Sequence, residues 1–201
     1  MIIMFTVIGF LCGCFMFSYW LGLAVKKDLR EIGDGNPGAF NLWHVAGYKL
    51  GILGISLDFM KGYLPLLLFL NYGLIKGLLI VPVAISPILG QVFSPFMKFK
   101  GGKAIAVTFG VWSALTSFEV SIAYAIILAI LLFGAKLLKV KKEVATDLDG
   151  FMIVLGMSLL GLYLMARAFP LYLIILWLLN LILLSYTNRN KLYKLLKRTS
   201  L

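Results

Sequence analysis

The stretch Phe99-Lys100-Gly101-Gly102-Lys103 lies between two apolar segments of the chain. Paired glycines allow the backbone to turn with positive φ and to approach a ligand closely. Consecutive N–H groups ahead of a helix form a concave anion site, and lysines add point charges suited to phosphate. The stretch therefore predicts a phosphate-binding loop. A second interpretation is that the two lysines only anchor helix ends at a cytoplasmic membrane surface.

The apolar segments around this loop determine the fold class. The chain has 201 residues, of which 62% are hydrophobic and 13% are charged. Several apolar runs reach or approach the roughly 18–20 residues that a helix needs to cross a bilayer. The alternating pattern of a membrane β-barrel is not found. We therefore expect an all-α, polytopic membrane protein that forms a single domain over residues 1–201.

Seven transmembrane helices are expected, although the fourth is short for a full crossing. They cover residues 1–25, 50–70, 76–97, 104–117, 120–138, 151–166 and 169–187. The longest loop is expected at residues 26–49, and a basic amphipathic tail at 188–198 is expected to lie on the membrane surface.

The positive charge supports this count. The net charge is +11, and most lysines and arginines fall in four clusters at residues 26–49, 98–103, 136–142 and 189–198. A crossing at residues 104–117 places all four on one side, as the positive-inside rule requires. The amino terminus is then outside and the carboxyl terminus is cytoplasmic. Such clusters attract anionic lipids and substrates, and no nucleic-acid partner is expected.

Metal and covalent chemistry are not expected. Cys12 and Cys14 point in different directions on a helix, and His44 is the single histidine. No cluster of histidine, cysteine and carboxylate side chains exists for a metal, and a lone histidine offers no Ser-His-Asp arrangement. We expect neither a metal nor another cofactor.

Polar residues are expected to converge at the cytoplasmic face. The predicted topology places the loop at residues 33–44 on the same side as Lys100 to Lys103. Asp58 and Lys61 lie three residues apart inside a span, where charged residues are usually paired or functional. A self-satisfied ion pair that holds helices in register is the alternative role for these two.

In the order and spacing of its motifs, the chain resembles the bacterial integral-membrane acyl-phosphate:glycerol-3-phosphate acyltransferases. The resemblance covers nearly the whole chain. It rests on Asp28-Leu29-Arg30, on the G-x-G-N-x-G-x-x-N frame at Gly33, Gly35, Asn36, Gly38 and Asn41, on Asp58-Phe59-Met60-Lys61-Gly62, and on Phe99-Lys100-Gly101-Gly102-Lys103.

The resemblance implies a function. A fatty acyl group would pass from acyl phosphate to the 1-hydroxyl of glycerol 3-phosphate, giving lysophosphatidic acid and phosphate for phospholipid synthesis. The enzyme would be a multi-pass protein of the bacterial inner (plasma) membrane, with its active site facing the cytoplasm. An upstream enzyme would supply the acyl phosphate.

The same resemblance implies two groups of site residues. The group expected to act in catalysis is Lys103, Asn36, Asn41, Gln91 and His44. The group expected to bind phosphate is Lys100, Gly101, Gly102, Lys103, Gly35, Gly38, Lys61, Arg30 and Asp34.

The chain differs from the family pattern at several site positions. Asp34 replaces a serine, His44 an arginine, Gln91 a histidine and Ala104 a glycine. Asp34 puts a negative charge beside a phosphate site unless it is paired, and Gln91 cannot act as a general acid or base. A divergent, catalytically weakened or inactive paralogue that binds another phosphorylated or lipid partner is the alternative function. A small transporter, suggested by proline-broken helices, is a third.

Overall fold

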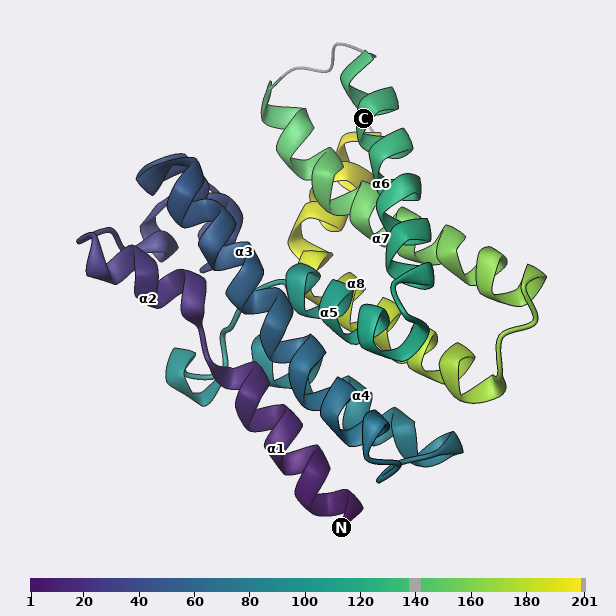
Figure 1. Cartoon of the computed structure of the whole chain (residues 1–201). Coiled ribbons are helices and arrows are strands. Elements are labelled where there is room, and N and C mark those ends of the chain that lie inside the picture. The colour runs from purple at the N-terminus through teal and green to yellow at the C-terminus, as the bar shows by residue number, and fades with distance from the viewer. Residues whose placement is uncertain (138–141, 200–201) are drawn as a thin grey trace. The chain divides into compact units, whose positions relative to one another are not determined.

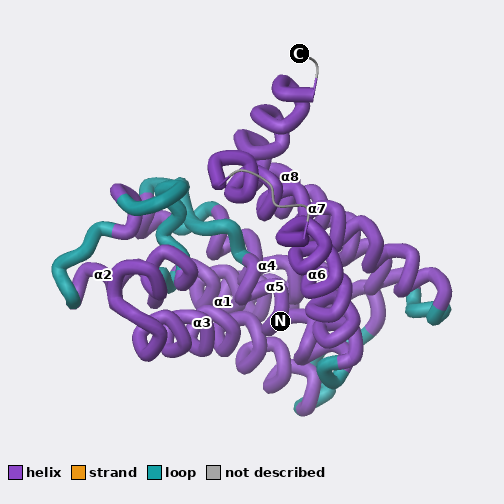
Figure 2. The backbone as a smooth tube through the Cα atoms, turned by 90° about the horizontal axis from the view of Figure 1, so that it is seen from above, coloured by secondary structure: helices purple, strands orange, loops and turns teal. Residues whose placement is uncertain are grey.

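Every element in the described part of the chain is a helix. The computed structural model describes the backbone of residues 1–137 and 142–199. Its elements are α1 (Ile2–Cys14), α2 (Phe17–Ala24), η1 (Leu29–Glu31), α3 (Ala39–Asn71), η2 (Gly77–Leu79), α4 (Ile80–Val92), η3 (Pro95–Met97), α5 (Ile105–Thr116), α6 (Glu119–Leu137), α7 (Lys142–Ala166) and α8 (Leu171–Thr199) (Figure 1, Figure 2). The all-α prediction is confirmed. Contacts divide the chain into two compact units, Met1–Ser117 and Phe118–Leu201, which are described separately below.

The helices are those of a polytopic membrane protein. Five helical stretches are long and apolar enough to cross a bilayer: Ile2–Ala24, Ala39–Asn71, Gly77–Met97, Leu148–Ala166 and Leu171–Lys197. Two apolar helices are shorter, at Ile105–Thr116 and Glu119–Ala135. Helix α5 is about 18 Å long at 1.5 Å per residue, against a hydrocarbon core of about 30 Å. The count of seven crossings therefore stays a prediction.

The predicted first span agrees with the candidate span Ile2–Ala24, although Phe15 adopts extended backbone angles that interrupt it between α1 and α2. Two other predicted boundaries are wrong. The expected loop at residues 26–49 ends early, since α3 begins at Ala39 and is only kinked at Gly47. The expected surface tail is the end of α8, where no glycine or proline interrupts the helix. The basic cluster expected at residues 136–142 falls outside the side chains that the structure describes.

Side chains bind the backbone carbonyls that lack helical partners at the break after α1 and at Pro87 in α4. The Ser94 hydroxyl donates to the Cys14 carbonyl at 2.7 Å, and the Lys61 ammonium donates to the Phe15 carbonyl. In α4, Pro87 has no N–H for the Val83 carbonyl, and the Ser86 hydroxyl donates there at 2.8 Å. A break inside a bilayer is tolerated only where such partners exist. The side-chain donors therefore stabilise both interruptions in the helices of the first unit.

Glycines allow the helices of the first unit to cross in close contact. A Cβ on Gly13 of α1 would lie 2.1 Å from the Pro87 carbonyl oxygen, and one on Gly90 of α4 would lie 2.2 Å from that of Phe10. At the crossing of α3 and α5, a Cβ on Gly110 would lie 2.1 Å from the Phe59 oxygen. Small residues at such crossings let helix backbones approach in membranes. These contacts set how closely α1 packs on α4 and α3 packs on α5.

A pair of glycine substitutions tests this packing. Gly110→Ala forces α3 and α5 apart, and we expect it to lower stability by about 1–3 kcal/mol. Gly134→Ala in α6 is the matched control, because a Cβ there meets nothing within 4 Å. We expect the control to leave stability unchanged or slightly raised, since alanine favours helix. Thermal unfolding in lipid nanodiscs measures both, and equal midpoints for the two variants would contradict the packing account.

Candidate active site

A cavity of about 320 Å³ lies between α3, the end of α4 and the start of α5. Its polar lining comes from Asn36, Asp58, Gln91 and Lys103. The remaining lining is apolar or backbone, from Gly38, Ala39, Phe40, Trp43, Ile55, Ala104, Ile105, Ala106, Val107 and Phe109. A cavity with one polar end and apolar walls suits a ligand that has a charged head and an apolar body.

Lys103 forms an ion pair with Asp34 at this polar end. The Lys103 Nζ lies 2.5 Å from the Asp34 Oδ2, and the two side chains are 15% and 26% exposed. The negative charge of Asp34 is therefore paired, which removes the conflict expected from the sequence. A phosphate that binds Lys103 has to share it with Asp34 or displace the carboxylate.

Asn41 holds the loop that carries Asp34. The Asn41 side chain is buried on the first turn of α3, and its Nδ2 donates to the carbonyls of Ile32 at 2.8 Å and Asn36 at 2.9 Å. It also donates to the Asp34 Oδ1 at 3.2 Å, which accepts from the Asn36 N–H as well. Asn41 does not line the cavity. These hydrogen bonds hold the loop in place, and the catalytic role expected of Asn41 from the sequence stays a prediction.

The glycine pair after Lys100 caps a helix. The Gly101 N–H donates to the Val92 carbonyl at 2.9 Å, and the Gly102 N–H donates to the Gln91 carbonyl at 3.0 Å. These carbonyls end α4, where intrahelical partners run out. A Cβ on Gly101 would lie 2.0 Å from the Gln91 carbonyl oxygen, so the loop needs glycine to approach so closely. The N–H groups of Gly101 and Gly102, which were expected to bind an anion, therefore donate to carbonyls of the protein.

The N–H groups of Gly35 and Gly38, in the loop at residues 33–38, are also used within the protein. The Gly35 N–H donates to the Ile32 carbonyl at 2.9 Å, and the Gly38 N–H donates to the Asn36 carbonyl at 2.8 Å. Gly35 has a φ of 71°, which glycine adopts without the steric cost of a side chain. Both glycines shape the loop that carries Asn36 and Asp34, and their N–H groups are already used.

Lys61 lies in a buried network and not at the rim of the phosphate site. Its Nζ lies 2.8 Å from the Asp58 Oδ1, and the side chains are 3% and 5% exposed. The ammonium also donates to the Phe15 carbonyl and to the Gln91 Oε1. The Ser18 hydroxyl donates to the Asp58 Oδ2 at 2.5 Å. The expected Asp58–Lys61 pair is confirmed. The phosphate contact expected of Lys61 stays a prediction, since the ammonium faces these buried partners and its side chain does not line the cavity.

Three further predicted site residues, Arg30, His44 and Lys100, also lie outside the cavity lining. The Arg30 guanidinium pairs with Asp28 at 2.5 Å, and its hydrogen bonds lower the pKa of Asp28 to about 2. His44 is exposed and contacts the Phe40 ring, with 4.5 Å between ring centroids. Lys100 is exposed. The cavity lining thus includes Asn36, Gly38, Gln91 and Lys103 from the predicted set.

The sequence interpretation missed part of the cavity wall. Phe40 and Trp43 line the cavity from the first turns of α3, and Phe109 does so from α5. The spacing of Phe40 and Trp43 fits one helix face, a signal hidden when the segment is taken as a loop. Asp58 also lines the cavity. Ala104, the N-cap residue before α5, has a φ of 60°, a left-handed conformation that suits the glycine of the family pattern.

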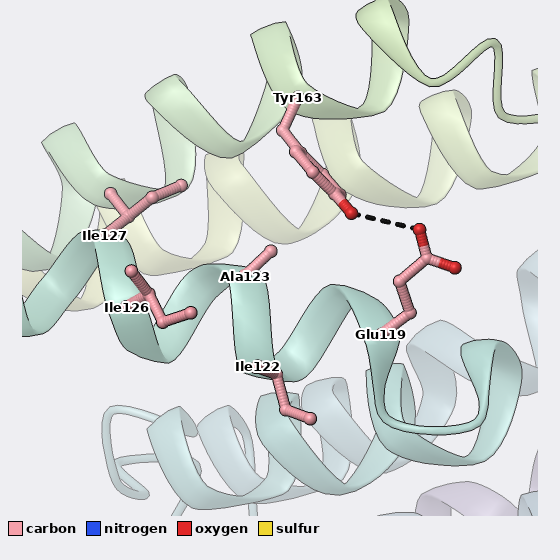
Figure 3. Close-up of a pocket in the computed structure, with 6 residues that line it drawn as sticks. All are labelled: Glu119, Ile122, Ala123, Ile126, Ile127 and Tyr163. Atoms are coloured by element: carbon pink, nitrogen blue, oxygen red, sulfur yellow. Dashed lines mark hydrogen bonds between the residues drawn. The ribbon is translucent and has the colours of Figure 1, made fainter.

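A second hollow, of about 480 Å³, lies on α6 and α7 in the other unit (Figure 3). Glu119 and Tyr163 meet at one end of it, where the Tyr163 hydroxyl donates to the Glu119 Oε1 at 3.0 Å. Arg167 pairs with the same carboxylate at 3.2 Å. The rest of the lining is apolar, from Ile122, Ala123, Ile126 and Ile127. None of the predicted site residues lies here.

Comparisons with known proteins agree with the motif order. The family model described as "Glycerol-3-phosphate acyltransferase" matches residues 3–198. "Glycerol-3-phosphate acyltransferase 1" of Thermotoga maritima is 39% identical over 195 residues, which cover 94% of this chain and 95% of the relative. "Glycerol-3-phosphate acyltransferase 2" of Bacillus anthracis is 36% identical over 134 residues, covering 65% of this chain and 68% of the relative.

The fold is also shared with a solved structure. The crystal structure of PlsY (YgiH), described as an integral membrane glycerol 3-phosphate acyltransferase in its glycerol 3-phosphate form, has a TM-score of 0.81 and 24% identity. The match covers 98% of this chain and 92% of that one. The family model spans almost the whole sequence, and the Thermotoga relative is similar over nearly its full length. This chain therefore belongs to the glycerol-3-phosphate acyltransferase family.

Proposed function

We propose that this chain transfers a fatty acyl group from acyl phosphate to the 1-hydroxyl of glycerol 3-phosphate, giving lysophosphatidic acid and phosphate. The proposal rests on the cavity, whose lining combines Lys103 and polar side chains with apolar walls. Family membership supports the acceptor, because the similar solved protein is described in a glycerol 3-phosphate form and in a lysophosphatidic acid form.

The polar end suits a phosphate group. Lys103 supplies a cation and the Gln91 amide supplies a hydrogen-bond donor, while Asn36 presents its Oδ1 toward Gly102 and its Nδ2 toward Gly38. The apolar side chains of Phe40, Trp43 and Phe109 suit the start of an acyl chain, which would continue between helices into the bilayer.

The reaction needs no side chain as a base. The 1-hydroxyl oxygen attacks the acyl carbonyl carbon, the bond from that carbon to the phosphate oxygen breaks, and phosphate leaves with the electron pair. A phosphate dianion takes the hydroxyl proton, which balances the step. Asp58 is the one carboxylate in the described lining, where its Oδ1 forms an ion pair with Lys61 and its Oδ2 accepts from the Ser18 hydroxyl. Catalysis then rests on positioning and on electrostatic stabilisation of charge.

We place the site at the cytoplasmic face of a bacterial inner (plasma) membrane, with seven crossings. The basic clusters at residues 26–49 and 98–103 surround the cavity loops and favour this side. An upstream enzyme that makes acyl phosphate would then work in the same compartment.

Product formation tests the activity. Purified protein in lipid, given acyl phosphate and labelled glycerol 3-phosphate, is expected to form labelled lysophosphatidic acid. Lys103→Ala removes the cation of the polar end, and we expect it to lower kcat/KM by about 100-fold or more. Wild-type protein that forms no more product than Lys103→Ala would exclude the proposed reaction and favour the inactive-paralogue alternative.

Removing the charge of Asp34 tests how Lys103 is used. Asp34→Asn keeps an Oδ1 acceptor for Asn36 and Asn41 but ends the ion pair with Lys103. Because a substrate phosphate no longer competes with a carboxylate, we expect KM for a phosphate substrate to fall about 3–10-fold. Glu31→Gln is the control, because it also removes one negative charge but at an exposed position, and it should leave KM unchanged. A rise in KM for Asp34→Asn would show that the carboxylate contributes to substrate binding.

Cysteine labelling tests the crossing of α5. In a background with Cys12→Ala and Cys14→Ala, single variants Tyr72→Cys, Phe118→Cys and Lys98→Cys are treated on intact cells with a membrane-impermeant maleimide. We expect labelling at positions 72 and 118 and protection at 98, because α3 and α5 would both end outside. Protection at 118 together with labelling at 72 would make α5 re-entrant and remove one crossing.

A further inference from the structure

The amide of Gln91 is held in one orientation. Gln91 is buried on the last turn of α4, and its Oε1 accepts from the Lys61 ammonium. An ammonium carries donors and no acceptor, so it binds the oxygen of an amide and never the nitrogen. Lys61 therefore directs the Gln91 Nε2 away from itself.

The Nε2 lies at the polar end of the cavity. A Cβ built on Gly102 would be 2.6 Å from the Gln91 Nε2 and 3.6 Å from the Asn36 Oδ1, so the two amides converge beside Gly102. Gln91, Asn36 and Lys103 all line the cavity. The donor that Lys61 orients thus belongs to the same cavity lining as the cation proposed to bind phosphate.

Lys61 has little freedom to move. The Asp58 carboxylate, the Phe15 carbonyl and the Gln91 amide surround its Nζ, and Ser18 fixes the far oxygen of Asp58. The side chain is 3% exposed and does not line the cavity. A rotation of the Gln91 amide would place its donor against the ammonium and leave its oxygen toward an anionic substrate.

We infer that Lys61 is a positioning residue for acyl transfer, which acts through Gln91 by presenting the Nε2 as a hydrogen-bond donor to a substrate phosphate oxygen. The inference rests on the proposed function. The phosphate belongs to glycerol 3-phosphate or to acyl phosphate, and separate KM values for the two distinguish them.

A double-mutant cycle tests this coupling. Gln91→Leu removes the donor, and the charge-neutral pair Asp58→Asn with Lys61→Met removes its orientation. We expect either change to raise KM for one phosphate substrate about 10-fold or more, with kcat within about 3-fold, as loss of a hydrogen bond to a charged group predicts. Gln91→Leu added to the neutral pair should raise KM by less than about 3-fold further.

Additivity would overturn the inference. If Gln91→Leu raises KM by the same factor in both backgrounds, or if the neutral pair lowers kcat with KM unchanged, Lys61 does not act through Gln91. The same cycle can be measured by calorimetry, as the affinity for glycerol 3-phosphate and for inorganic phosphate. Affinities test the coupling of Lys61 and Gln91 even if wild-type protein shows no turnover. Absence of turnover would count against the proposed reaction alone.

Two further variants separate positioning from folding. Gln91→Glu keeps an acceptor for Lys61 and replaces the donor by oxygen, so we expect folding to be retained and KM to rise at least as much as for Gln91→Leu. Glu119→Gln with Arg167→Met removes an ion pair in the other unit and should leave both KM values unchanged. Thermal unfolding in lipid is measured for each variant, and a KM for Gln91→Glu equal to that of wild type would contradict the donor role.

Discussion

The first unit depends on the contacts that the Lys61 ammonium makes. It binds the carbonyl freed where α1 breaks, a carboxylate one turn earlier in α3 and an amide at the end of α4. Within a bilayer a buried charge and a broken helix each need such partners, and here one group serves both. Removing one member of a buried pair typically costs about 3–5 kcal/mol, because the other charge is left without compensation. The network therefore constrains three helices at the base of the cavity.

This constraint explains the division of roles among the site residues. Lys61 is used within the protein, so Lys103 is the cation at the polar end of the cavity. The glycines of both loops donate their N–H groups to neighbouring carbonyls and shape the loops that hold Asn36, Asp34 and Lys103. In the proposed site, side chains are then left to bind substrate, and the Asp34 carboxylate partly neutralises the lysine that would bind phosphate.

Much of this could be predicted from the sequence. Apolar length predicts the membrane helices, the spacing of Asp58 and Lys61 predicts their pairing, and the motif order predicts the family. The use of the Gly101 and Gly102 amides could not be predicted, because it depends on which helix end lies beneath the loop. The break after Cys14 carries no glycine or proline signal at Phe15 and Met16. The pair of Asp34 and Lys103 joins residues 69 apart in the sequence, a contact that local patterns do not reveal.

A structure determined in lipid with glycerol 3-phosphate bound would show which residues hold the phosphate. We expect the phosphate on the Lys103 Nζ and within hydrogen-bond distance of the Gln91 Nε2, with Asp34 displaced from the lysine. Lys61 should still contact Asp58, the Phe15 carbonyl and the Gln91 oxygen. A phosphate bound to Lys61, with Lys103 still paired to Asp34, would exclude this arrangement.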